Sequence, residues 1–232
     1  MTSRLVAVTF DAANPTELAS FWGSMLGRDV TDEADGFLIR STPTQVGLRF
    51  VEEVSFRPPG PNRLHLHLTS TSLDDQQQSV ERALSLGGRQ LDIGQLPEEG
   101  HVVLADPGGN EFCVIEPGNN FLAGCGHLGE VSCDGSRAVG LFWHDVLGWP
   151  LVWDQDQETA VQSPEGGTKV SWGGPPVAAK HGRNRQRLDL VADDVPAEVA
   201  RLVGLGARQL GDLDGAVELA DPDGNEFLVA QS

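Results

Sequence analysis

Residues 105–114 read ADPGGNEFCV, and residues 220–229 read ADPDGNEFLV. Eight of the ten positions are identical. Asp-Pro followed by two turn-forming residues predicts a tight turn, because proline presets φ and glycine accepts a positive φ. The apolar and aromatic residues after the turn predict a β-strand. Because one strand-turn-strand corner recurs about half a chain apart, the sequence indicates two copies of one domain.

Composition and charge exclude several classes of protein. The chain has 232 residues, of which 39% are hydrophobic and 22% charged, as in ordinary globular proteins with a packed core. Its formal net charge of −18 argues against nucleic acid and against anionic membranes as partners. The N-terminal apolar run is interrupted by Asp11 and is too short for a signal sequence or a membrane span. We therefore expect a cytoplasmic protein.

The chain has three cysteines, Cys113, Cys125 and Cys133. Their number is odd and they form no CxxC pair, so the sequence predicts neither a disulfide framework nor a structural zinc site. Reduced cysteine behaves as a small hydrophobic residue, and we expect buried free thiols.

Predicted elements follow the order βαβββ four times. The predicted strands of the first half span 4–11, 28–31, 37–41, 46–52, 63–69, 90–93, 101–106 and 110–116. Those of the second half include 127–133, 159–162, 169–172 and 185–191, besides the final corner strands. The first helix is predicted to begin at Asn14-Pro15 and to end at Gly27, and the others span 73–86, 136–147 and 195–205.

These units define an α+β protein of two domains, each with two βαβββ units. We place the first domain at 1–117, a Gly/Asn-rich linker at 118–126 and the second domain at 127–232. The sequence leaves open whether units pair within one half or exchange between the halves. It also leaves open whether the protein is a monomer or a homodimer.

Several of these features together resemble one known family. They are the paired βαβββ units, the helices with Phe-Trp before a Leu-Gly, the RLHLHL strand at 63–68 and the closing DPxGNEF corner. They resemble the glyoxalase-like members of the vicinal oxygen chelate superfamily, which includes glyoxalases, extradiol dioxygenases and bleomycin-resistance binding proteins. The resemblance covers nearly the whole chain and implies mixed sheets that curve into two cups. One fold carries many functions, so it implies no single activity.

The resemblance also implies that functional groups enter each cup from its first, fourth, fifth and eighth strands. In the first half these places fall at Ala7, at Leu48 or Phe50, at His65 and at Cys113. In the second half they fall at Leu128, at Val170 or Trp172, at Arg187 and at Leu228. Only His65 matches the usual His and Glu metal ligands of the family.

This departure bears on the cofactor. Metal catalysis of the superfamily type needs at least three His or carboxylate ligands and an open coordination site. One histidine with one thiolate is too few, and Arg187 would repel a cation in the second cup. We therefore expect no metal cofactor.

An alternative interpretation joins His65, His67 and Glu111 in a metal site. Residues two apart on a strand share a face, and two histidines with one carboxylate suit non-haem iron. With such a divalent metal, the protein would be a lyase or a dioxygenase-like enzyme. However, Glu111 recurs as Glu226 in a strand without such a site, so a structural hydrogen bond explains it more simply.

The second cup offers Glu130, Arg187 and Asp189, with Trp172 and Trp153 nearby. Aromatic walls with a few placed charges are typical of a small-molecule pocket, in which an arginine grips a carboxylate or a phosphate. Ion pairs within the sheet and tryptophans in the core would explain the same residues. Both interpretations stay open at this point.

We predict a tandem glyoxalase-like protein that binds a small organic molecule without the metal triad. The candidate ligand-contacting residues are His65, His67, Phe50, Glu111, Cys113, Glu130, Trp153, Trp172, Arg187 and Asp189. The alternatives are the metal-dependent enzyme and a tandem in which one degenerate domain has a purely structural role.

Overall fold

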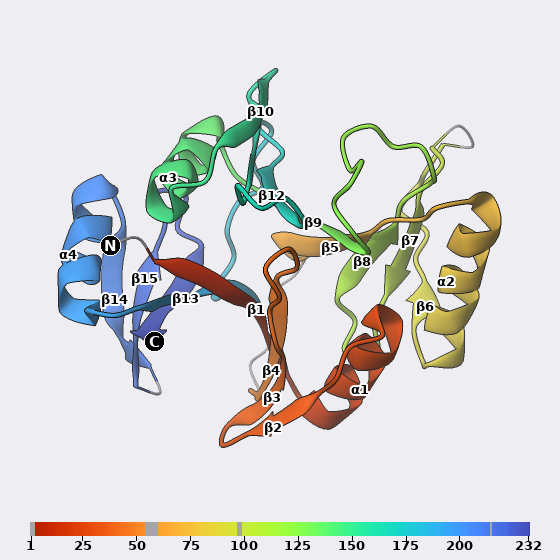
Figure 1. Cartoon of the computed structure of the whole chain (residues 1–232), viewed down its shortest axis with the longest axis horizontal. Coiled ribbons are helices and arrows are strands. Elements are labelled where there is room, and N and C mark those ends of the chain that lie inside the picture. The colour runs from red at the N-terminus through yellow and green to blue at the C-terminus, as the bar shows by residue number, and fades with distance from the viewer. Residues whose placement is uncertain (1–2, 54–59, 97–98, 214) are drawn as a thin grey trace.

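A computed structural model describes residues 3–53, 60–96, 99–213 and 215–232 (Figure 1). The four βαβββ units that the sequence predicts are all present. Unit 1 contains β1 (Arg4–Ala12), α1 (Pro15–Leu26), β2 (Thr31–Glu33), β3 (Gly36–Ile39) and β4 (Gly47–Glu52). Unit 2 contains β5 (Leu64–Leu68), α2 (Leu73–Ser85), β6 (Arg89–Gln90), β7 (Val102–Ala105) and β8 (Glu111–Val114). Unit 3 contains β9 (Leu128–Cys133), α3 (Arg137–Leu147), β10 (Leu151–Gln155), β11 (Glu158–Gln162) and β12 (Lys169–Trp172). Unit 4 contains β13 (Gln186–Ala192), α4 (Val195–Leu205), β14 (Arg208–Leu213), β15 (Ala216–Ala220) and β16 (Glu226–Gln231).

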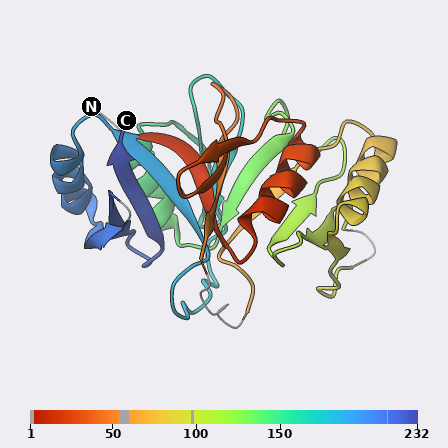
Figure 2. The same ribbon diagram turned by 90° about the horizontal axis from the view of Figure 1, so that it is seen from below.

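The units exchange between the two halves of the chain. One eight-stranded mixed sheet, here called cup A, has the order β14-β15-β16-β13-β1-β4-β3-β2 and joins unit 4 to unit 1. The other, cup B, has the order β10-β11-β12-β9-β5-β8-β7-β6 and joins unit 3 to unit 2. The central pairs β1–β13 and β5–β9 are antiparallel. Neither 1–117 nor 127–232 therefore closes a cup by itself. Figure 2 shows the two sheets side by side, with α4 and α2 at opposite ends.

Within each half, the two units pack through the sides of their sheets that face the helices. Trp22 of α1 meets the ring of Phe112 in unit 2, with centroids 5.1 Å apart. Trp143 of α3 meets Phe227 in unit 4 in the same way, at 5.0 Å. The faces on the helix side thus pack within a half, whereas the strand edges that complete each sheet come from the opposite half.

The repeated corner also anchors those tryptophans by hydrogen bonds. Trp22 Nε1 donates to Asp106 Oδ2 at 3.0 Å, and Trp143 Nε1 donates to Asp221 Oδ2 at 3.4 Å. Both aspartates are buried, and burial raises the pKa of each carboxyl against the opposing effect of its hydrogen bonds. The corner that identifies the repeat thus joins the two units of each half.

The asparagine of each corner reaches the other half. Arg63 Nε donates to Asn225 Oδ1 at 2.7 Å, so a side chain of unit 2 holds the corner of unit 4. Arg185 Nη2 donates to Asn110 Oδ1, so unit 4 holds the corner of unit 2. The same four residues therefore tie the halves together twice, with approximate two-fold symmetry.

The two halves also contact each other near the end of the linker. Gln45 Nε2 donates to the carbonyl of Cys125 at 2.8 Å, and Gln45 Oε1 accepts from the backbone N–H of Leu128 at 2.9 Å. Nearby, a Cβ on Gly167 would lie 1.7 Å from the carbonyl oxygen of Thr44, so only glycine permits this approach.

Local signals confirm some predicted boundaries and correct others. Asn14 Oδ1 caps α1 by accepting from Glu17 N, and Gly27 ends the helix at φ 62°, as predicted. The strand predicted at 28–31 begins instead at Thr31, because the backbone N–H of Arg28 still bonds to the end of α1, donating to the carbonyl of Gly23 at 3.0 Å. The three cysteines are free and buried, which confirms that prediction. None of the helices described is long and apolar enough to cross a membrane.

The corner makes a testable contribution to stability. We expect Trp22→Phe to lower the free energy of unfolding by about 1–3 kcal/mol, because it leaves the buried carboxylate of Asp106 with one donor fewer. The exposed Gln78→Ala variant on α2 serves as the control and should change stability by less than about 0.5 kcal/mol. Urea denaturation measures both, and a Trp22→Phe variant as stable as the control would contradict the role of this bond.

Candidate functional site

The floor of cup B carries a row of polar side chains from three neighbouring strands. Along β5, Leu64, Leu66 and Leu68 are buried on the helix side, so His65 and His67 face the cup and are partly exposed. In register, His67 lies opposite Cys113 of β8 on one side and opposite Glu130 of β9 on the other. The exchange of units therefore places a carboxylate of the second half beside a histidine of the first.

His67 and Glu130 form an ion pair in which Glu130 is buried and His67 is partly exposed. The distance from His67 Nδ1 to Glu130 Oε2 is 2.5 Å, and Ser171 of β12 donates to the other carboxylate oxygen. Burial alone would lower the pKa of His67, but Cys113 and Glu130 outweigh it and raise that pKa to about 10. Burial would likewise raise the pKa of Glu130, but its bonds to His67 and Ser171 lower it. His67 is therefore an imidazolium at neutral pH.

His65 has the opposite character. Its ring centroid lies 4.8 Å from that of His67. Burial, followed by the charge of His67, lowers the pKa of His65 to about 4, so its imidazole is neutral at pH 7. Cup B thus sets a neutral imidazole beside a charged one.

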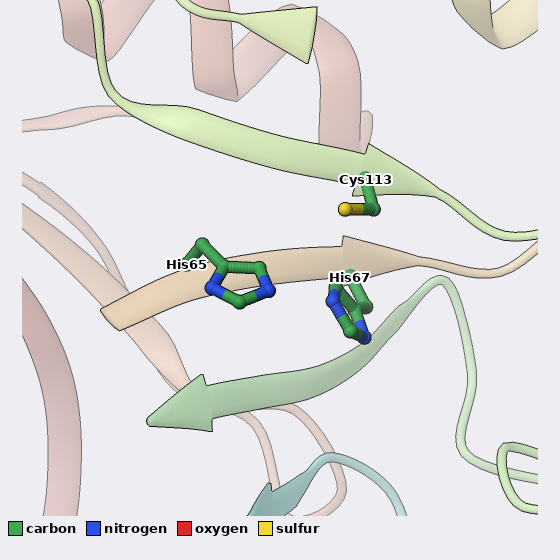
Figure 3. Close-up of side chains that lie close together, drawn as sticks. All are labelled: His65, His67 and Cys113. Atoms are coloured by element: carbon green, nitrogen blue, oxygen red, sulfur yellow. The ribbon is translucent and has the colours of Figure 1, made fainter. Parts of the chain in front are cut away.

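Three of these side chains converge closely enough to consider a metal ion. Single ligand atoms of His65, His67 and Cys113 all lie within 4.8 Å of one another (Figure 3). Nitrogen and sulfur donors suit zinc-type ions, whose ligands lie about 2.0–2.3 Å from the metal. The donor types fit, but the group would have to contract, and His67 would have to give up its proton.

Glu111 does not belong to that convergent group, so the metal set of the sequence alternative is corrected. Its carboxylate accepts from the backbone N–H of Asn62 at 3.3 Å. Glu226 accepts from the backbone N–H of Asn184 at 3.2 Å in the other half. The repeated glutamate thus makes the same hydrogen bond next to each corner.

The linker forms one wall of cup B. Leu122 and Cys125 pack with Val103, Cys113 and Ile115 in an apolar cluster separate from the main core. Phe121 lies edge-on to Trp153 of β10, with centroids 5.8 Å apart. Trp153 is therefore in cup B, together with His65 and His67, rather than beside Arg187.

Cup A holds a network of ion pairs. Arg187 donates to Asp11, and Thr9 donates to Asp189, all four being buried. Burial raises the pKa of Asp189, although Arg187 and Thr9 oppose the shift. Arg49 lies 3.4 Å from Asp189. Because guanidinium groups occupy its floor, cup A does not fit a metal ion.

The grouping of Glu130 with Arg187 and Asp189 is corrected by this arrangement. Arg187 and Asp189 belong to cup A, whereas Glu130 belongs to cup B. The reason is the exchange of units, which separates unit 3 from unit 4. Of the two explanations that stayed open for Arg187, the structure supports an ion pair within the sheet, with Asp11 as the partner.

Two predicted aromatic walls lie in the core instead. Phe50 and Trp172 are 0% and 1% exposed on the helix side of their strands, and Trp172 stacks on Trp143 with centroids 6.2 Å apart. The cup-facing residues are their neighbours in the chain, Arg49 and Ser171. Leu48, Val170 and Leu128 are also buried with the core. Successive side chains of a strand point to opposite faces, so an error of one residue in the sequence interpretation replaces a cup-facing side chain by a core side chain.

Ser171 and Lys169 are functional candidates that the sequence interpretation missed. Both face cup B from β12, since they lie on the same side as Glu130 in the register. The alternation of Lys169 and Ser171 with Val170 and Trp172 was the available signal.

Comparison with known proteins agrees with this geometry. Glyoxalase I from Zea mays superposes with a TM-score of 0.66 at 16% identity, covering 99% of this chain and 92% of that one. A putative dioxygenase from Bacillus subtilis subsp. subtilis str. 168 superposes with a TM-score of 0.61 at 12% identity, covering 99% and 85%. No curated protein matches the sequence. The paired units and the two cups define a fold of the vicinal oxygen chelate superfamily. The model of the glyoxalase-like domain matches residues 7–115 and 130–230, and the chain belongs to that family.

The ion pair of cup B predicts a pH-dependent stability. The folded-state pKa of His67, about 10, exceeds its ordinary value of 6.5, so the stabilisation is complete below pH 6.5 and is lost as pH rises through 10. We expect His67→Asn to cost about 3 kcal/mol at pH 6.5 and progressively less toward pH 10. Urea denaturation between pH 6.5 and pH 10, in a buffer that contains a metal chelator, measures how this cost changes with pH. The exposed His181→Asn control should show none, and a His67 effect that is constant with pH would contradict the pair.

Proposed function

We propose that the chain binds a small organic molecule in cup B without the metal ligand set of the superfamily's enzymes. The observation that carries this proposal is the pairing of Glu130, whose two carboxylate oxygens contact His67 and Ser171. A carboxylate held this way completes an ion pair inside the protein. Glu130 lies on β9, the first strand of unit 3, and the family resemblance implies that a first strand supplies a metal ligand.

The lining of cup B supports the binding of an organic ligand. Polar groups such as His65, Ser132 and Gln162 are partly exposed on its concave side. Phe121 and Trp153 supply aromatic surface next to them. A few placed polar groups between apolar walls are typical of small-molecule sites.

Cup A is proposed to have a structural role. Its buried Arg187 donates to Asp11 and its buried Asp189 accepts from Thr9, so each of these charged groups has at least one partner inside the fold. This assigns the degenerate-domain alternative to one cup and ligand binding to the other.

A metal-dependent lyase or dioxygenase-like enzyme is the second candidate. The convergence of His65, His67 and Cys113 favours it. A bound divalent ion would supply Lewis-acid polarisation of a substrate oxygen. In that case the neutral imidazole of His65 would be the ligand that binds without losing a proton.

Metal analysis of protein purified without a His-tag separates the two candidates. We expect far less than one equivalent of iron, manganese, nickel or zinc, with no difference between the natural protein and His65→Ala. One equivalent of metal that is lost in His65→Ala, but kept in the exposed His181→Ala control, would overturn the metal-free proposal.

Ligand-detected NMR with a library of small organic fragments tests binding itself. We expect hits whose signals weaken when Ser132→Trp fills cup B and persist when Arg49→Ala alters cup A. The proposed function would be contradicted if the signals of the hits were unchanged in Ser132→Trp, or if no fragment of the library bound.

A further inference from the structure

Lys169 places a positive charge on the concave side of cup B. It is partly buried, and its register partner on β9 is Glu130. Its ammonium donates to the backbone carbonyl of Phe121 and lies 4.2 Å from the centroid of the Phe121 ring. It therefore sits where the linker wall meets the sheet.

This ammonium has no carboxylate partner among the residues that the structure describes. The other lysine of the chain, Lys180, lies 2.7 Å from Glu226. Glu130, the register partner of Lys169, is instead engaged by His67 and Ser171. An ammonium has three donors, and one carbonyl and one ring leave capacity for another acceptor.

The surroundings make this charge distinctive. The chain as a whole has a net charge of −18, whereas Lys169 brings a positive charge to cup B. Partial burial of an unmatched charge costs free energy unless a counter-charge is supplied. The position thus favours a ligand that brings a negative charge.

The neighbouring wall is aromatic. The rings of Phe121 and Trp153 meet at 81°, with centroids 5.8 Å apart, and both are partly exposed. Flat apolar groups pack well against aromatic faces and edges. A ligand that reaches Lys169 would therefore pass along aromatic surface.

Cup A has no counterpart of this cation. Gly47 takes the corresponding place, since it lies opposite Ala7 as Lys169 lies opposite Glu130. A Cβ at Gly47 would come within 2.5 Å of the carbonyl oxygen of Val6, so no side chain fits there. At this register position, only cup B therefore carries a cationic side chain.

We propose that Lys169 makes cup B selective for small anions with a flat apolar body, of the class of aromatic carboxylates. This inference rests on the proposed binding function. The carboxylate accepts from the ammonium of Lys169, and the ring lies along Phe121 and Trp153. Lys169 is thus a specificity-determining residue as well as an anchor of the linker.

Titration with cinnamate and with its neutral analogue cinnamamide tests the inference, followed by NMR or tryptophan fluorescence. The natural protein should bind cinnamate at least tenfold more tightly than cinnamamide. Lys169→Met should weaken cinnamate binding at least tenfold and cinnamamide binding less than threefold. Lys169→Arg should keep the preference for the anion. Lys180→Met, which removes the paired lysine, is the matched control and should change neither affinity.

Other results would overturn the inference in distinguishable ways. If Lys169→Met weakened the binding of cinnamate and cinnamamide equally, with an unchanged melting temperature, the role of Lys169 would be only to anchor the linker. Equal affinities in the natural protein would remove the preference for an anion while leaving small-molecule binding intact. If neither probe binds, aromatic carboxylates are excluded, and the fragment library decides separately whether cup B binds organic ligands at all.

Discussion

The arrangement of the whole molecule depends on a buried aspartate at each repeated corner. Asp106 and Asp221 each accept a hydrogen bond from the helix tryptophan of the preceding unit, which closes the two units of a half upon each other. The asparagine four residues later accepts from an arginine of the opposite half. The sides of the sheets that face the helices pack within each half, and each sheet is completed by a unit of the opposite half. The pairing of His67 with Glu130 is a consequence of that exchange.

Duplication left two cups with the same backbone and different chemistry. Corresponding positions on the central strands hold His65 and His67 in cup B but Arg187 and Asp189 in cup A. The guanidinium of Arg187 is paired with Asp11 inside the fold of cup A. Cup B keeps partly exposed imidazoles, a thiol and the ammonium of Lys169 on a concave surface. The difference supports assigning ligand binding to cup B.

The sequence predicts the fold well and the site only in part. The corner, the Phe-Trp helices and the alternating RLHLHL strand are local signals, so the units and the inward direction of His65 and His67 follow from them. Phe50 and Trp172 were misplaced by one residue, because the polar residues that alternate with them, Arg49 and Ser171, take the cup side and leave the aromatic rings on the helix side. The meeting of Glu130 with His67 depends on which units share a sheet. No local pattern encodes that choice, and only the three-dimensional pairing reveals it.

A double-mutant cycle between His67 and Glu130 tests the central claim, that the cups form by exchange between the halves. Unfolding free energies of His67→Gln, Glu130→Gln and the double variant should give a coupling of about 1–3 kcal/mol, because the two side chains are in contact across the halves. The comparison cycle between Glu130 and Arg187, which lie in different cups, should be additive within about 0.5 kcal/mol. Additivity for His67 and Glu130, with coupling between Glu130 and Arg187 instead, would contradict the exchange.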